Sequence, residues 1–98
     1  MITDEQAREI AKNPDGCDLT ELADLVYYID AGPWRAARRL WGATPGFKPV
    51  ITVRMIGVYC RSCIKDRKAR QSGNILKAFR HEYTADTIYN NLPKSIRW

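Results

Sequence analysis

The stretch Pro49–Gln71, which reads PVITVRMIGVYCRSCIKDRKARQ, decides the fold class of this chain. Wound as a helix at about 100° per residue, it places four basic side chains in one sector about 60° wide: Arg54, Arg61, Lys65 and Lys68. Apolar residues then occupy the adjoining side: Ile51, Met55, Val58, Tyr59, Cys63 and Ala69. A strand leaves Arg54 and Lys65 on no shared face, so the pattern favours a single helix.

A strand near residues 50–60 is the alternative for the same stretch. The segment Val50–Val53 is rich in β-branched residues, which favour strands. Gly57 weakens a helix slightly, by under about 1 kcal/mol relative to alanine. The alternative fold is therefore α+β, with a short strand or hairpin in this segment.

Two helices are predicted before this stretch by their capping sequences. Thr3–Gln6 is a capping box and opens a helix that runs to about Lys12. Asp18 and Glu21 repeat the capping pattern for a second helix. Apolar residues recur in it at spacings of three and four: Leu19, Leu22, Leu25, Val26 and Ile29.

A short helix and a long one complete the pattern. Residues 33–42 begin with a proline, which suits the first helical position, and end with a glycine, which can close a helix. The last helix spans about 75–92, and we expect it to be well covered because apolar residues occupy most of its sides: Ile75, Phe79, Tyr83, Ala85, Ile88, Tyr89 and Leu92. The tail, residues 94–98, is expected either to dock through Ile96 or Trp98 or to fray.

We therefore expect one all-α domain over residues 1–98, a small bundle of four or five helices ending in an antiparallel helical hairpin around Gly73. The composition, 45% hydrophobic and 28% charged, is that of a globular protein.

No stretch reaches the ~20 apolar residues of a membrane span. Three cysteines cannot all pair with one another, which indicates a reducing compartment. We expect a soluble, cytoplasmic protein with no membrane partner.

The C-terminal third carries two resemblances. The run Gly73–Ala78, followed seven residues later by Ala85, resembles the turn and second helix of a single tetratricopeptide unit, which implies a helical hairpin. The same third is similar to small uncharacterised proteins encoded by phages and prophages, on the residues Arg70, Gly73, Asn74, Ile75, Ala78, Glu82, Asp86, Ile88, Tyr89, Leu92, Pro93, Arg97 and Trp98. That resemblance implies an accessory phage protein in a bacterial cytoplasm.

The net charge of +5 conceals a strong asymmetry. Residues 1–30 hold two basic and eight acidic residues, whereas residues 31–98 hold fourteen basic and three acidic ones. Such a distribution is typical of a basic surface that meets a polyanion or an acidic protein. It is equally typical of an acidic segment that lies against the basic part of the same molecule.

The basic residues carry the leading hypothesis, non-enzymatic binding to the DNA or RNA backbone. Arg54, Arg61, Lys65 and Lys68, here called the basic stripe, are extended by Lys77 and Arg80 and suit phosphate contacts. A second patch on the short helix comprises Arg35, Arg38 and Arg39, and residues 22–42 also resemble a helix–turn–helix in outline. The alternative is a protein–protein interaction module that binds a host or phage protein through its tryptophans or its acidic N-terminal helices.

The cysteines and the acidic pair of the last helix are interpreted as structural residues. Cys60 and Cys63 are spaced like zinc ligands, and Cys17 with His81 would complete a Cys₃His site, but we favour packing in the core. Glu82 and Asp86 are expected to form salt bridges with Arg67 or Arg70 across the hairpin. Neither a phosphate-binding glycine loop nor a nucleophile in a recognisable context is present, so we expect no enzyme and no cofactor. A symmetric dimer is compatible with so short a chain.

Overall fold

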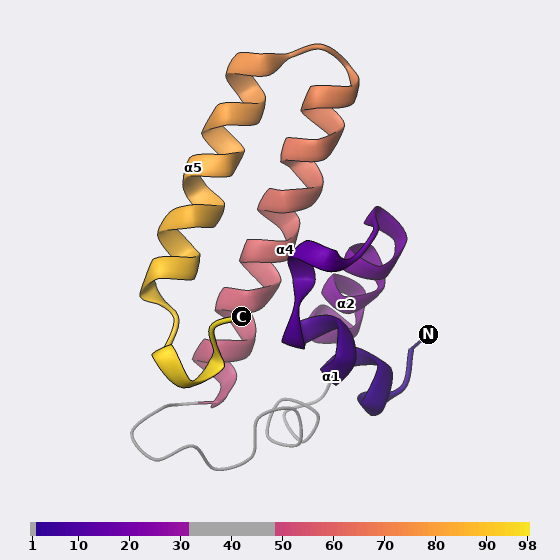
Figure 1. Ribbon diagram of the computed structural model, residues 1–98. Coiled ribbons are helices and arrows are strands. Elements are labelled where there is room, and N and C mark those ends of the chain that lie inside the picture. The colour runs from indigo at the N-terminus through magenta and orange to yellow at the C-terminus, as the bar shows by residue number, and fades with distance from the viewer. Residues whose placement is uncertain (1, 32–48) are drawn as a thin grey trace.

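The computed structural model describes residues 2–31 and 49–98, which form helices joined by short turns (Figure 1). The elements, with η for a 3-10 helix, are α1 (Asp4–Lys12), η1 (Pro14–Gly16), α2 (Leu19–Ala31), α4 (Pro49–Gln71), α5 (Ile75–Asn91) and η2 (Lys94–Ile96). The all-α fold with a C-terminal helical hairpin is confirmed. The alternative strand near residues 50–60 is wrong, because that segment lies inside α4. The short helix predicted at 33–42, with Arg35, Arg38 and Arg39, lies outside the described residues.

Capping boxes begin both N-terminal helices, as the sequence predicts. The Thr3 hydroxyl accepts the backbone N–H of Gln6 at 3.2 Å, and the Gln6 side chain accepts that of Thr3 at 2.9 Å. Asp18 and Glu21 form the same reciprocal pair at 2.8 and 3.3 Å. The caps fix the residue at which each helix begins, and the apolar face of each helix then turns towards the core. The buried residues of these two helices are Ala7, Ile10, Ala11, Leu22, Leu25 and Tyr28.

Two neighbouring helices cover α4, which makes its buried surface wider than one stripe. α2 packs against one side of it and α5 against another. The buried residues therefore extend around most of the helix: Val53, Ile56, Tyr59, Cys60, Ser62 and Ala69. The basic stripe occupies the remaining exposed sector. Val58, expected on the apolar side, is 40% exposed because at 100° per residue it falls next to Arg54 and Lys65.

Gly73 ends α4 and reverses the chain into α5. Its φ of 81° lies in the left-handed region that favours glycine. The N–H of Asn74 donates to the carbonyl of Ala69 at 2.9 Å, and that of Gly73 donates to Arg70 at 3.1 Å, which is the Schellman pattern of a helix C-terminus. The Asn74 side chain then caps α5 by accepting the N–H of Lys77 at 3.2 Å. The result is an antiparallel hairpin of two long helices (Figure 1).

Only one side of α5 is covered, so the expectation that this helix is well covered is wrong. Ala78 and Ala85 are buried, and their small side chains allow α5 to approach α4 closely. In the described part of the chain, α4 is the one helix that makes extensive contacts with α5. The opposite side of α5 therefore faces solvent and exposes Ile75, Leu76, Phe79 and Tyr83.

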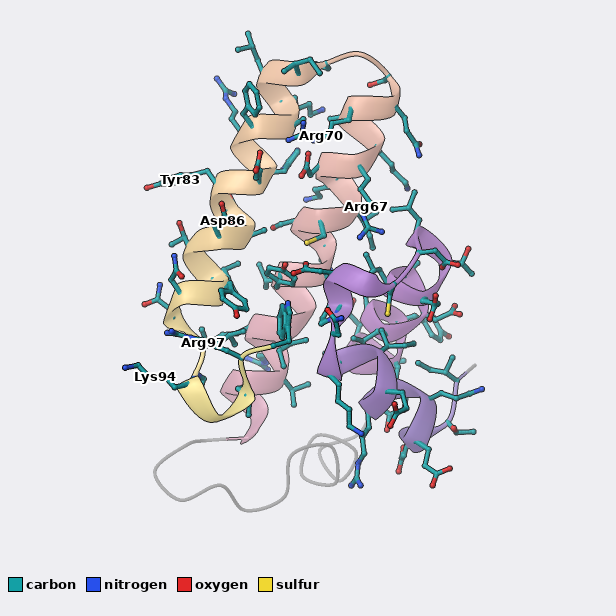
Figure 2. All side chains as sticks on the ribbon, in the orientation of Figure 1. Arg67, Arg70, Tyr83, Asp86, Lys94 and Arg97 are labelled. Atoms are coloured by element: carbon teal, nitrogen blue, oxygen red, sulfur yellow. The ribbon has the colours of Figure 1, made fainter. Side chains whose placement is uncertain are left out.

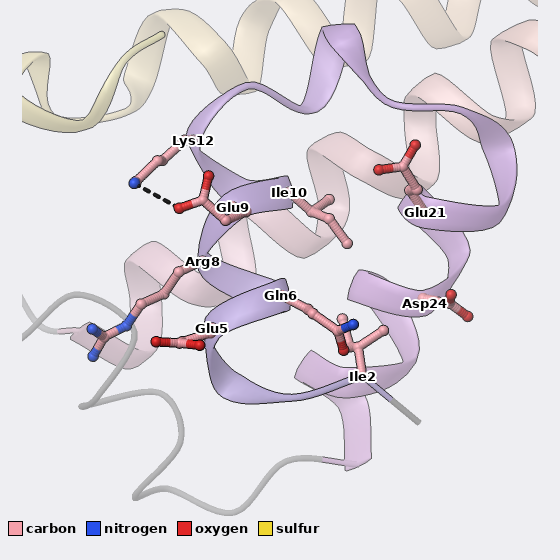
Figure 3. Close-up of a pocket in the computed structure, with 9 residues that line it drawn as sticks. All are labelled: Ile2, Glu5, Gln6, Arg8, Glu9, Ile10, Lys12, Glu21 and Asp24. Carbon is pink, nitrogen blue, oxygen red and sulfur yellow. Dashed lines mark hydrogen bonds and ion pairs between the residues drawn. The ribbon is translucent and has the colours of Figure 1, made fainter.

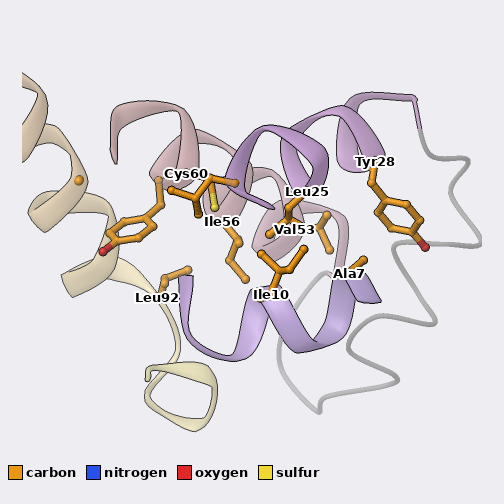
Figure 4. Close-up of a cluster of buried hydrophobic side chains, with 12 residues drawn as sticks. Ala7, Ile10, Leu25, Tyr28, Val53, Ile56, Cys60 and Leu92 are labelled. Carbon is orange, nitrogen blue, oxygen red and sulfur yellow. The ribbon is translucent and has the colours of Figure 1, made fainter. Parts of the chain in front are cut away.

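One core joins the N-terminal helices to the hairpin (Figure 4). Ile56 and Cys60 of α4 are completely buried and belong to the same cluster as residues of α1 and α2. Gly57 of α4 faces Ile29 of α2, and a Cβ at this position would lie in ordinary van der Waals contact with Ile29 Cγ2, at 3.4 Å. Leu92, just after α5, extends the cluster towards the C-terminus.

The tail docks on this core through Trp98, as predicted. The indole ring centroid lies 4.9 Å from that of Tyr59 and 5.0 Å from that of Tyr89, both in edge-to-face geometry. The tail thus covers one end of the hairpin. The other end, residues 65–83, contains the Gly73 turn, which projects beyond α1 and α2 (Figure 1). We call this end the hairpin tip. No helix among the described residues is long and apolar enough to cross a membrane.

Candidate functional site

A cationic groove of about 440 Å³ lies at the hairpin tip, between the end of α4 and the start of α5. It is lined by Lys65, Lys68, Ala69, Ser72, Asn74, Lys77 and His81, and we call it the lysine groove. None of these lining residues is acidic. Three lysines and a histidine therefore line one cavity on the surface of the hairpin.

Local helix chemistry explains why these cations meet. Lys68 lies in the last turn of α4, where the helix dipole favours positive charge, and Lys65 lies on the same face about one turn earlier. Lys77 and His81 are four residues apart and lie on the same face of α5. The Gly73 turn folds that face back towards the end of α4, so lysines and a histidine that are nine to sixteen positions apart in the sequence share the groove.

Arg70 neutralises the carboxylates of α4 and α5 at the hairpin tip. Its Nε donates to Asp66 Oδ1 at 2.7 Å, and its Nη2 donates to Glu82 Oε2 at 2.8 Å. The hydrogen bond to Asp66 is the main cause of a raised pKa for Arg70. The predicted salt bridge between Glu82 and Arg70 is confirmed. Within the described residues, no ion pair joins Lys65, Lys68 or Lys77 to a carboxylate.

Arg67 binds backbone instead of a carboxylate. Its Nη1 donates to the carbonyl oxygen of Cys17 at 2.7 Å, and this contact ties α4 to the turn that precedes α2. Asp86, the other acid expected in the cross-hairpin salt bridges, is exposed on α5 (Figure 2).

The basic stripe is divided by an ion pair. Arg61 pairs with Asp30 at the end of α2, so part of its charge is neutralised by the N-terminal half of the chain. Arg54 is exposed, but eleven residues of helix place it about 16 Å along α4 from Lys65. The structure therefore unites Lys65 and Lys68 with Lys77 and His81, and separates them from Arg54 and Arg61.

The cysteines lie apart from the lysine groove. Cys60 is completely buried in the core, as its packing role predicts, and burial raises the pKa of its thiol to about 12. Burial also raises the thiol pKa of Cys63 and of Cys17. No group of three potential metal ligands occurs in the part of the chain that the structure describes, and His81 lines the lysine groove instead.

A second cavity, of about 830 Å³, lies between α1 and α2 (Figure 3). Its lining combines apolar Ile2 and Ile10 with four acids, Glu5, Glu9, Glu21 and Asp24, and also includes Gln6, Arg8 and Lys12. Lys12 pairs with Glu9 at 2.8 Å. This groove is acidic on balance and is suited to cationic groups rather than to phosphates.

His81 and the residues of the turn are the parts of the lysine groove that the sequence did not indicate. A lone histidine predicts no particular partner, and Ser72 and Asn74 read only as helix-ending residues. The available signal was the phase of α5: once Gly73 is accepted as the turn, Lys77 and His81 fall on the edge that borders α4.

Comparison of the chain with protein-family models, with curated proteins and with solved structures gives no match.

Proposed function

We propose that this protein binds the phosphate backbone of nucleic acid through the lysine groove. The observation that carries the proposal is the acid-free lining of the groove, where three lysines and a histidine face one cavity. Lysine ammonium groups neutralise phosphates and release condensed counterions, which is the main source of sequence-independent affinity.

Two further features support a polyanion as the ligand. The N-terminus of α5 borders the groove and adds the positive end of a helix dipole. Arg70 holds Asp66 and Glu82 on the other edge of the hairpin, which reduces their repulsion of an incoming phosphate. Arg54 is a further exposed cation on α4 that suits a more distant phosphate of the same strand.

A salt titration tests the proposal directly. With three lysine contacts, duplex affinity should fall about 40-fold between about 50 and 200 mM salt, measured by fluorescence anisotropy. Lys68→Glu should weaken binding strongly and reduce the salt slope by about one.

Lys94→Glu is the matched control, because Lys94 is exposed at the opposite end of α5 and its replacement changes the net charge equally (Figure 2). Equal effects of the two variants would contradict the groove as the site, and absence of binding at low salt would contradict the function.

The second candidate function is binding of a basic protein segment in the groove between α1 and α2. Four carboxylates around Ile2 and Ile10 favour a partner with cationic and apolar side chains. Asp24→Lys and Glu5→Lys should then abolish capture of that partner, while Lys68→Glu leaves capture intact. The two candidate functions therefore respond to different variants.

A further inference from the structure

An exposed apolar stripe runs along α5 at the hairpin tip. Leu76, Phe79 and Tyr83 are spaced by three and four residues and share one face of the helix. Their exposed fractions are 79%, 53% and 75%. Tyr83 points away from α4 into solvent (Figure 2). Single exposed apolar residues are common, but three on one helical face form a patch suited to binding.

Cations and acids flank this stripe on different sides. At 100° per residue, Arg80 lies between Tyr83 and Lys77 on the circumference of α5. Both Arg80 and Lys77 are exposed, and Lys77 also lines the lysine groove. The acidic residues Glu82 and Asp86 lie on the other side of the stripe. Around the circumference of α5, starting from the lysine groove, the cations Lys77 and Arg80 therefore come first, and the aromatic ring of Tyr83 follows them.

We propose that the hairpin tip prefers single-stranded nucleic acid, whose phosphates lie on Lys77 and Arg80 while unpaired bases stack on Tyr83 and Phe79. The inference rests on the proposed function and adds the class of nucleic acid. Bases in a duplex are stacked on one another and offer no free face to a side chain, whereas unpaired bases stack on exposed aromatic rings.

The two rings differ in how they are held. Phe79 and Tyr83 are about 6 Å apart along the helix axis, so neighbouring nucleotides of one strand can reach both. The Arg70 guanidinium carbon lies 5.5 Å from the Phe79 ring centroid and covers one face of that ring. Tyr83 is the more exposed ring and is therefore the main stacking platform.

An abasic strand separates base stacking from phosphate binding. Fluorescence anisotropy compares an oligothymidylate of about 12 nucleotides with an abasic strand of the same length and charge. Wild-type protein should bind the oligothymidylate at least about fivefold more tightly. Equal affinity for the two strands would overturn stacking and leave phosphate binding intact. Binding to neither strand at about 50 mM salt would overturn both proposals.

Variants of exposed tyrosines complete the test. Tyr83→Ala should reduce the preference for the oligothymidylate by about fivefold and leave affinity for the abasic strand unchanged, whereas Tyr83→Phe retains the preference. Tyr27→Ala is the control, because Tyr27 is 61% exposed on α2, away from the hairpin tip. A preference that survives Tyr83→Ala in a folded protein, or that Tyr27→Ala removes equally, would overturn the proposal.

Discussion

The indole N–H of Trp98 donates a 2.9 Å hydrogen bond to Asp15 Oδ2, across 83 positions of sequence. The other carboxylate oxygen of Asp15 accepts the hydroxyl of Tyr59. Asp15 therefore joins η1, the middle of α4 and the C-terminal tail. Burial, followed by this hydrogen bond, raises the pKa of Tyr59 well above its ordinary value, so the phenol stays neutral as a donor.

Trp98→Ala should destabilise the protein by about 2–3 kcal/mol, since it removes two edge-to-face ring contacts and one hydrogen bond. Trp98→Phe should cost about half as much, because it keeps a ring against Tyr59 and Tyr89 and loses only the donor. Urea denaturation followed by circular dichroism measures both. Equal losses for the two variants would mean that the hydrogen bond, and not ring packing, holds the tail.

Gly73→Ala should cost about 1 kcal/mol of unfolding free energy, because a Cβ disfavours a φ of 81°. No steric clash adds to this cost, since nothing lies within 4 Å of the Cβ position. Gly73→Asn should cost less, because asparagine tolerates the left-handed region better than alanine does. A neutral Gly73→Ala, measured by urea denaturation, would contradict the Schellman turn.

Local signals made most of the fold predictable. The capping boxes at Thr3 and Asp18 each depend on residues only three positions apart, so they can be recognised in the sequence without knowledge of the tertiary structure. The helix over 49–71 followed from the phase of its basic residues, which outweighed the β-branched run at its start. The exposure of Tyr83 was not predictable in the same way, because it depends on which sides of α5 receive neighbours.

The lysine groove was predicted only in part. Lys65 and Lys68 were identified from the basic stripe, since helical phase alone groups them. The ion pair between Arg61 and Asp30 depends on how α2 packs on α4, which no local pattern specifies. His81 lines the same groove as Lys65, and a lone histidine does not by itself indicate this position.

Cys60 should make the protein less stable at alkaline pH. Burial raises its pKa to about 12, whereas a thiol in the unfolded chain ionises near pH ~8.5. Between these values the unfolded state loses a proton that the folded state keeps, so stability falls as pH rises, by up to ~1.4 kcal/mol per pH unit. The full contribution of the neutral Cys60 thiol to the free energy of unfolding is present below about pH 8.5.

Urea denaturation at about pH 7.5 and 10 under reducing conditions should show a smaller decline in unfolding free energy for Cys60→Ala than for the wild-type protein. Parallel declines would contradict a buried neutral thiol.

Asp30→Asn should strengthen nucleic-acid binding by extending the cationic surface along α4. The substitution releases Arg61 from its ion pair, and Arg61 lies one helical turn before Lys65. Stability should change little, since exposed ion pairs contribute about 0–1 kcal/mol. The salt slope of binding should become steeper by about one, because one more phosphate is neutralised.

The double variant Asp30→Asn/Arg61→Gln separates this effect from the simple loss of a negative charge: it should return the slope to the wild-type value. A gain in slope that persists in the double variant would show that Arg61 makes no phosphate contact and that Asp30 acts only through long-range repulsion.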